Sequence, residues 1–76
     1  MELSEFINNF AEQFDEIEVS TLKGDTVFKE LDGWNSLVAL SVIAMIDEEY
    51  DVTLKGNDIT GAATIEDLFN VVCSQM

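Results

Sequence analysis

Apolar residues recur every three or four positions between Leu3 and Ile17, which is the spacing of one face of an α-helix. Polar and acidic residues fill the positions between them. When residues are placed about 100° apart, the apolar set falls within an arc of about 140° and comprises Leu3, Phe6, Ile7, Phe10, Ala11, Phe14 and Ile17. The pattern predicts an amphipathic helix over residues 3–17, with Ser4 as its cap and one face against a core.

Residues 18–35 show no sustained period and predict a long first loop. Gly24-Asp25 marks a turn within it, and Val27, Phe28 and Leu31 can form one helical turn that folds onto the core. Loops between neighbouring helices commonly have about 2–8 residues. The greater length here suggests a connection that crosses the end of a helical bundle and leads to an exposed corner at Ser36.

The longest apolar segment begins at Ser36 and predicts a second helix to about Asp51. Asn35 is a strong capping residue, and its side chain can accept a hydrogen bond from the amide of Leu37 or Val38. The residues expected on the core face of this helix are Ala39, Val42, Ile43, Ile46 and Tyr50. The residues expected on the opposite, solvent-facing side are Leu37, Val38, Ser41, Met45, Glu48 and Glu49.

Apolar side chains on the expected solvent-facing side indicate a docking surface for partner proteins, because contiguous exposed apolar patches tend to mark interaction sites. A methionine suits such a surface because its flexible side chain adapts to several partners. The alternative is that another helix or the long loop covers the same side chains. The residues predicted to dock partners are Leu37, Val38, Ser41, Met45 and Glu48.

The rest of the chain predicts a short helical turn and a last helix. Gly56 interrupts the apolar pattern and leaves room for only a short turn around Ile59. Thr64 and Asp67 then form a capping-box-like start. Cys73 lies at the edge of the apolar stripe, where we expect a small core side chain rather than a reactive thiol. That stripe comprises Ile65, Leu68, Phe69, Val72 and Met76.

The length of 76 residues predicts a single domain over residues 1–76, near the lower size limit for folding without disulfides or metals. A single cysteine permits no internal disulfide, and the absence of histidine removes the usual zinc ligands. This composition fits a reducing cytoplasm. No run approaches the roughly 18 apolar residues of a membrane span, and we expect no cleaved signal peptide.

Sixteen acidic residues against three lysines give a formal net charge of −13. The resulting negative field would repel nucleic acid and anionic membranes, whereas it would attract protein partners with basic surfaces.

Ser36 is the candidate functional residue. With Asn35 as the cap, Ser36 takes the first helical position and its hydroxyl lies in solvent. A phosphate ester there would be near unpaired backbone amides at the positive end of the helix dipole, which favours an exposed anion by about 0.3–1 kcal/mol. The alternative interpretation of residues 32–37 is an ordinary helix start after a loop.

The sequence excludes several kinds of chemistry. Without histidine, Ser36 has no imidazole base, so no acyl-transfer triad is available. Twelve-residue windows from Asp32 and from Asp47 lack the glycine that a calcium loop needs at its sixth place, which argues against an acidic calcium-binding protein. Glu48 and Glu49 point about 100° apart on a helix and cannot act as an acid/base pair. We expect a protein without enzymatic activity and without a metal site.

The chain resembles the acyl carrier protein family over its whole length. The segments that carry this resemblance are Gly33-Trp34-Asn35-Ser36-Leu37, Asp47-Glu48-Glu49-Tyr50-Asp51 and Thr64-Ile65-Glu66-Asp67-Leu68. The resemblance implies an all-α four-helix bundle with three main helices, one short helix and a long first loop. It also implies that a separate phosphopantetheinyl transferase, using magnesium, transfers 4'-phosphopantetheine from coenzyme A to Ser36.

In such a family the pantetheine thiol carries an acyl or aminoacyl group as a thioester to acyl-processing enzymes, as in fatty-acid, polyketide or related biosynthesis. The resemblance therefore implies a stand-alone cytoplasmic carrier, monomeric, whose partners have basic surfaces and bind the second helix. A different class of function stays open, namely an unmodified adaptor of carrier-like fold that only binds partner proteins through the second helix.

Two positions depart from the family pattern. The family usually has aspartate immediately before the serine, and here Asn35 keeps the cap but removes a negative charge beside the site of modification. The fatty-acid carriers tend to have acids where this chain has Val38 and Ser41. Together with Trp34, these residues suggest partners outside ordinary fatty-acid synthesis.

Overall fold

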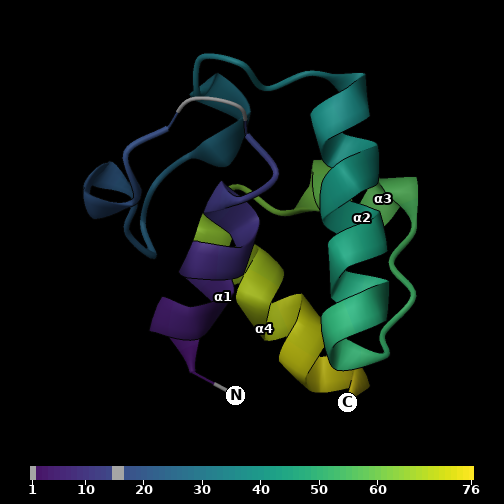
Figure 1. The fold of residues 1–76 in the computed structure, drawn as a ribbon. Helices are drawn as coiled ribbons and strands as arrows, with labels where there is room; N and C mark the ends of the chain where they lie inside the picture. The colour runs from purple at the N-terminus through teal and green to yellow at the C-terminus, as the bar shows by residue number, and fades with distance from the viewer. Residues whose placement is uncertain (1, 15–16) are drawn as a thin grey trace.

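The computed structural model describes residues 2–14 and 17–76, and over these ranges it contains helices and no strands. Three longer helices, α1 (Leu3–Ala11), α2 (Ser36–Tyr50) and α4 (Ile65–Gln75), surround a common core, and the short α3 (Gly56–Gly61) lies beside α2 (Figure 1). The predicted all-α four-helix bundle, with three main helices, one short helix and a long first loop, is confirmed.

The core lies between α1, α2 and α4, and the first loop adds Phe28 to it, with Leu31 half-buried against it. Val27 is 40% exposed, so its expected place on the core is wrong. The largest fully buried side chains are Phe6, Phe10, Phe28, Val42, Ile46, Ile65, Leu68 and Val72. Those of α1 and α4 belong to the apolar stripes expected from the sequence. The helical period therefore placed the inner faces of these two helices correctly.

Helix α1 is shorter than predicted, since it ends at Ala11 instead of continuing to Ile17. The N–H groups of Gln13 and Phe14 donate to carbonyls three residues back, both at 3.1 Å, which tightens the chain into a turn. This turn keeps Phe14 against the core, 5.5 Å from Phe10 between ring centroids. Residues 15–16 of the predicted helix lie outside the described residues.

The N-terminal cap of α1 also differs from the prediction. Ser4 lies inside the helix, and the capping position belongs to Glu2, whose side chain makes no capping hydrogen bond. Ser4 lies two residues after the capping position, so its hydroxyl cannot act as the cap, and the first turn of α1 relies on Phe6 and Ile7 in the core.

The first loop crosses the end of the bundle, as its length suggested, and contains two short 3₁₀ helices, η1 (Val19–Thr21) and η2 (Phe28–Glu30). The loop also pairs with the start of α4. The N–H of Ile65 donates to the carbonyl of Thr26 at 3.1 Å, and that of Glu66 donates to Gly24 at 2.8 Å. These bonds fix the loop and so determine where the chain enters α2.

Helix α4 begins with the predicted capping box. The N–H of Asp67 donates to Thr64 Oγ1 at 3.1 Å, and the N–H of Thr64 donates to the Asp67 carboxylate at 3.1 Å. Val72 is the last buried residue of α4, and Cys73 and Met76 are both exposed. The predictions that Cys73 is a small core side chain and that Met76 belongs to the buried stripe are therefore wrong. Within the described ranges, no helix has the length and apolarity needed to cross a membrane.

Candidate functional site

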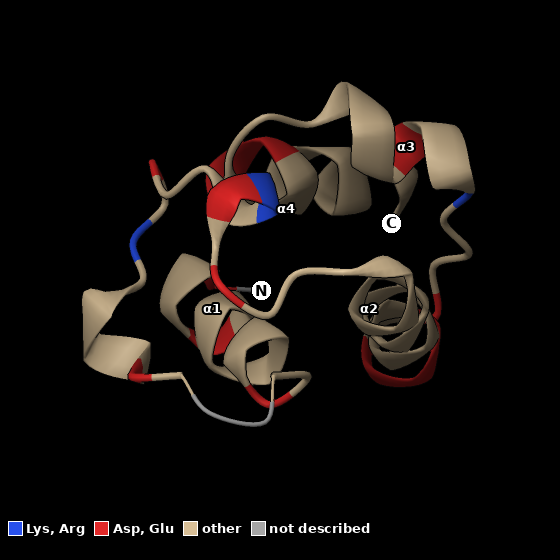
Figure 2. Cartoon of the chain, turned by 90° about the horizontal axis from the view of Figure 1, so that it is seen from above, with Lys and Arg blue, Asp and Glu red and all other residues tan. Residues whose placement is uncertain are grey.

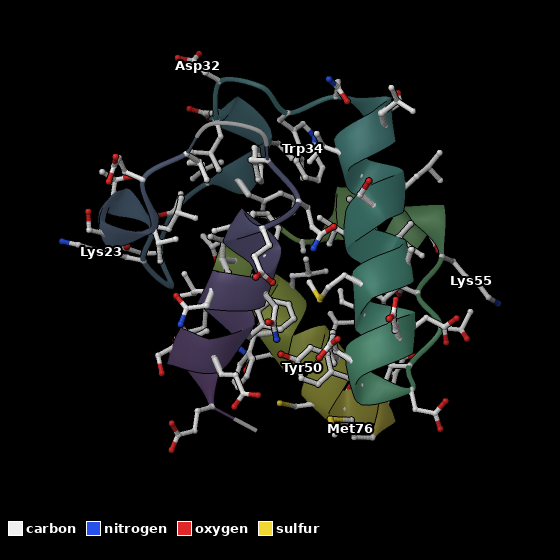
Figure 3. All side chains as sticks on the ribbon, in the orientation of Figure 1. Lys23, Asp32, Trp34, Tyr50, Lys55 and Met76 are labelled. Carbon is white, nitrogen blue, oxygen red and sulfur yellow. The ribbon has the colours of Figure 1, made fainter. Side chains whose placement is uncertain are left out.

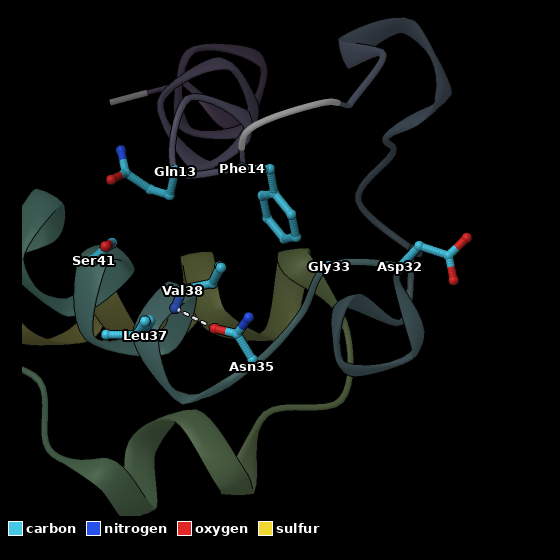
Figure 4. A pocket seen from close by; sticks show the side chains of 8 residues that line it. All are labelled: Gln13, Phe14, Asp32, Gly33, Asn35, Leu37, Val38 and Ser41. Carbon is cyan, nitrogen blue, oxygen red and sulfur yellow. Dashed lines mark hydrogen bonds between the residues drawn. The ribbon is translucent and has the colours of Figure 1, made fainter.

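Ser36 is the first residue of α2 and is exposed. The preceding residue, Asn35, has an extended backbone, and its Oδ1 accepts a hydrogen bond from the N–H of Val38 at 2.9 Å (Figure 4). The carbonyl of Asn35 accepts the first helical bond, from Ala39 at 2.9 Å. The structure thus confirms the predicted cap and the predicted exposure of Ser36, and it identifies Val38 as the capped amide.

The turn before Ser36 requires glycine. Gly33 has a φ of +91°, a conformation that residues with a Cβ rarely adopt. The chain turns back at this point, where the N–H of Trp34 donates to the carbonyl of Leu31 at 3.1 Å. As a result, Trp34 points into the molecule (Figure 3). Asn35 and Ser36 are exposed.

Four aromatic rings meet beneath this turn. Trp34 lies 5.0 Å from Phe28 and 6.3 Å from both Phe10 and Phe14, measured between ring centroids. The Phe10 and Trp34 rings are stacked at 10°, and the Phe28 and Trp34 rings meet edge to face at 69°. Such pairs each contribute about 0.5–1.5 kcal/mol beyond the area they bury. Trp34 therefore holds the start of α2 on the core, a role that the helical period could not predict because Trp34 lies in a loop.

The surroundings of Ser36 favour an anion. The backbone N–H groups of Ser36 and Leu37 lie in the first turn of α2, at the positive end of its dipole. Within the described residues, neither group has a hydrogen-bond partner. The segment 33–46 contains no charged residue. Asp32 points away from the turn in Figure 4, and the carboxylates of α2 lie at its opposite end, where the ribbon is red in Figure 2.

The predicted docking residues of α2 lie in three different environments. Leu37 is 75% exposed, and Ser41 and Glu48 are also exposed. Val38 is half-buried, and Met45 is only 7% exposed, so the expected exposure of Met45 is wrong.

The cause is the position of α1 alongside α2. The Nδ2 of Asn9 in α1 donates to the hydroxyl of Tyr50 at 2.8 Å, which ties α1 to the side of α2 that carries Met45. The buried strip of α2 is therefore Val42, Met45 and Ile46. The remaining residues of the predicted core face, which are only half-buried, are Ala39, Ile43 and Tyr50.

Leu40 is a surface residue that the sequence pattern did not predict. It is 62% exposed and lies one helical turn after Leu37 on the same outward side of α2. Because α2 is apolar on nearly every side, the period alone could not distinguish Leu40 from a core residue. The outward side of α2 continues from Leu40 to Ala44 and Asp47, which are both exposed. Of these residues, only the charged Asp47 indicates in the sequence which side of α2 faces solvent.

Two open depressions flank the start of α2. The α1–α2 cleft has a volume of about 620 Å³ and is lined by Gln13, Phe14, Asp32, Gly33, Asn35, Leu37, Val38 and Ser41 (Figure 4). The α2–α3 groove has a volume of about 530 Å³ and is lined by Lys29, Trp34, Asn35, Ser36, Ala39, Leu40, Ile43, Gly56, Ile59 and Thr60. Across residues 2–14 and 17–76, no three acidic or cysteine side chains are grouped to hold a metal ion.

Comparison with protein-family models matches residues 5–72 to the phosphopantetheine attachment site family. Comparisons with curated proteins and with solved structures give no significant match. Members of this family carry 4'-phosphopantetheine covalently on a serine, and such domains are carriers rather than catalysts. Since the match covers most of the chain and includes the exposed turn before α2, the chain belongs to the phosphopantetheine attachment site family and is a phosphopantetheine-carrying carrier protein.

Proposed function

We propose that Ser36 is the serine that receives 4'-phosphopantetheine. The observation that carries this proposal is the exposed hydroxyl of Ser36 at the first position of a capped helix, beside unpaired backbone amides. Two other serines lie within the matched residues. Ser20 belongs to the three-residue η1, and Ser41 lies in the middle of α2, where neighbouring amides are already bonded within the helix.

The residues around Ser36 fit the group that it would hold. A phosphodiester on the Ser36 oxygen would carry a negative charge at the positive end of α2, which is favourable. The N–H groups of Ser36 and Leu37 are available to it, since Asn35 caps the amide of Val38. When bound, the group supplies a thiol that holds an acyl or aminoacyl cargo as a thioester, and the chain itself supplies the attachment point and the surface that partners recognise.

The outward side of α2 is the surface that we propose for partner enzymes. Leu37 and Leu40 form its apolar part next to Ser36, and Ser41 borders it. Glu48 belongs to the acidic end of the same helix. This arrangement suits a partner that places apolar side chains beside its active-site entrance and basic side chains farther along α2. Phosphopantetheinyl transferase and acyl-processing enzymes of fatty-acid, polyketide or related biosynthesis are the proposed partners.

A modification assay tests the attachment. Incubation with coenzyme A, magnesium and a promiscuous phosphopantetheinyl transferase is expected to add one phosphopantetheine to the intact mass of the protein. The Ser36→Ala variant is expected to gain nothing, whereas Ser20→Ala, at an exposed serine of η1, is the matched control and is expected to gain the group. An unchanged mass for the parent protein, or the same gain in Ser36→Ala, would remove Ser36 from this role.

A second assay tests the docking surface. Leu40→Glu places a charge on the apolar part of the surface and is expected to slow modification by the same transferase severalfold. Val19→Glu is the matched control because Val19 is also an exposed apolar residue but lies in η1. Equal rates for the two variants would contradict docking through Leu40.

The exposed leucines also support the alternative of an adaptor that binds partners without modification. The two functions differ in their dependence on Ser36. For an adaptor, Ser36→Ala leaves partner binding unchanged while Leu37→Glu abolishes it. For a carrier, Ser36→Ala abolishes cargo transfer even where binding persists.

A further inference from the structure

The two depressions beside Ser36 differ in the chemistry of their walls. The pantetheine arm is a flexible chain that contains amide groups, a hydroxyl group and a pair of methyl groups. Such a chain needs hydrogen-bonding partners for its amides wherever it leaves water. The position of the arm, which presupposes the proposed attachment to Ser36, therefore depends on which depression offers those partners.

The α2–α3 groove offers few free polar groups. Its walls are mostly carbon, from Trp34, Ala39, Leu40, Ile43 and Ile59. The Nζ of Lys29 donates to the carbonyl of Thr60 at 2.6 Å, and the hydroxyl of Thr60 donates to the carbonyl of Asn57 at 3.3 Å. An amide chain in this groove would find the two remaining N–H donors of Lys29 and few other partners in exchange for the water it loses.

The α1–α2 cleft offers uncommitted polar groups on both of its walls. Gln13, on the α1 side, uses one N–H for the carbonyl of Asn9 at 3.0 Å, which leaves its amide oxygen and second N–H. Ser41, on the α2 side, has no side-chain hydrogen bond in the described part of the chain. Asn35 uses Oδ1 for the cap, and its NH₂ group points into the cleft in Figure 4. All three side chains can donate hydrogen bonds, and those of Gln13 and Ser41 can also accept them.

Apolar surface lies between these polar groups. The ring of Phe14 and the side chain of Val38 face the same cleft from opposite walls (Figure 4). They can contact the methyl groups of the arm while Gln13 and Ser41 bind its amides. The volume of about 620 Å³ falls within the range typical of small-molecule sites, about 300–1,000 Å³.

We propose that the α1–α2 cleft is the binding site for the amide-bearing arm attached to Ser36, with Gln13 and Ser41 as its hydrogen-bonding residues. Ser41 follows Ser36 by about 7.5 Å along the helix axis. A chain that starts at Ser36 therefore passes Leu37 and Val38 before it reaches Ser41. Ser36 itself lines the α2–α3 groove, whereas the α1–α2 cleft begins at its neighbours Asn35 and Leu37. The α2–α3 groove is therefore the competing position for the same arm.

Nuclear magnetic resonance of the apo and holo forms tests this position. Intact mass first shows that the arm is attached. Attachment is then expected to shift the side-chain NH₂ signals of Gln13 and the backbone amide of Ser41, and to leave Ile59 and Thr60 nearly unchanged. Nuclear Overhauser contacts are expected between the methyl groups of the arm and the ring of Phe14. Gln13 is the decisive reporter because it is far from Ser36 in sequence.

Two variants of the holo protein complete the test. Gln13→Ala combined with Ser41→Ala is expected to abolish the contacts with Phe14, whereas Thr60→Val, which alters the other groove, is expected to retain them. Circular dichroism checks that each variant is folded. Shifts at Ile59 and Thr60 in place of Gln13, or shifts in neither depression, would overturn the inference while the mass gain upholds the attachment. A parent protein that gains no mass would overturn both.

Discussion

Asn35 has two separable effects on the start of α2. Its side-chain oxygen caps the amide of Val38, and its neutral amide stands where an acid would place a negative charge next to Ser36. Aspartate and alanine substitutions separate these effects, because aspartate caps a helix about as well as asparagine does and alanine does not.

We predict that Asn35→Ala lowers the free energy of unfolding by about 1 kcal/mol and that Asn35→Asp leaves it nearly unchanged. Urea unfolding monitored by circular dichroism measures both. We also expect Asn35→Asp to be modified faster than the parent by a magnesium-dependent transferase, since a carboxylate beside Ser36 attracts the metal. Equal stability of all three proteins would show that the capping bond contributes nothing.

At the level of single residues, the sequence was sufficient where chemistry is local. The cap at Asn35 and the exposed hydroxyl of Ser36 depend only on neighbours in the chain, and both were predicted. The inward direction of Trp34 was missed because it depends on Phe10 and Phe28, which come from distant segments.

The elements differ in how much of their packing the sequence determines. Helices α1 and α4 have clear apolar stripes, so their core faces were predicted. Helix α2 is apolar on most sides, and its orientation depends on α1 and on the Asn9–Tyr50 hydrogen bond. The apolar pattern of α2 therefore predicted Met45 in solvent, although the structure buries it.

The orientation of α2 gives a stability prediction. Met45→Ala removes a buried side chain and is expected to lower the free energy of unfolding by roughly 2–5 kcal/mol. Leu40→Ala removes an exposed side chain of similar size and is expected to change it by less than about 0.5 kcal/mol. Thermal or urea unfolding compares the two, and the reverse order would contradict the orientation of α2.

The start of α4 gives a pH prediction. Hydrogen bonds from the backbone N–H of Thr64 and then of Ala63 lower the pKa of Asp67 from its ordinary value of 3.8. A carboxylate with a lowered pKa contributes stability that is present above its pKa in the unfolded chain and is lost as the pH falls through its pKa in the folded protein.

The stability difference between the parent and Asp67→Asn is therefore expected to be complete at neutral pH and to shrink as the pH falls below 3.8. Urea unfolding at a series of pH values measures this difference. Glu66→Gln is the control because it removes a charge from the same turn and leaves the capping bonds in place. A difference that is independent of pH would contradict the role of the Asp67 charge.

The molecule as a whole combines a small volume with a large charge. A formal net charge of −13 lies on a body with extents of 28 × 24 × 21 Å. Three lysines offset only a small part of the charge of sixteen acidic residues. The Debye length is about 10 Å at 0.1 M ionic strength, so moderate salt screens repulsion across the molecule.

We predict that the melting temperature rises between low and moderate ionic strength, because salt weakens the self-repulsion of the folded state. Differential scanning fluorimetry in increasing sodium chloride measures the rise, and divalent cations are expected to produce it at lower concentration. A melting temperature that is flat over this range would contradict the prediction.

The carrier function depends on the modification of one residue, which we propose to be Ser36. Its most direct test is the intact mass of the protein purified from its own cell, with fragmentation to locate any added group. We predict one phosphopantetheine, with or without its cargo, on the fragment that contains Ser36. A group located on another residue, or a protein that is entirely unmodified, would contradict the account.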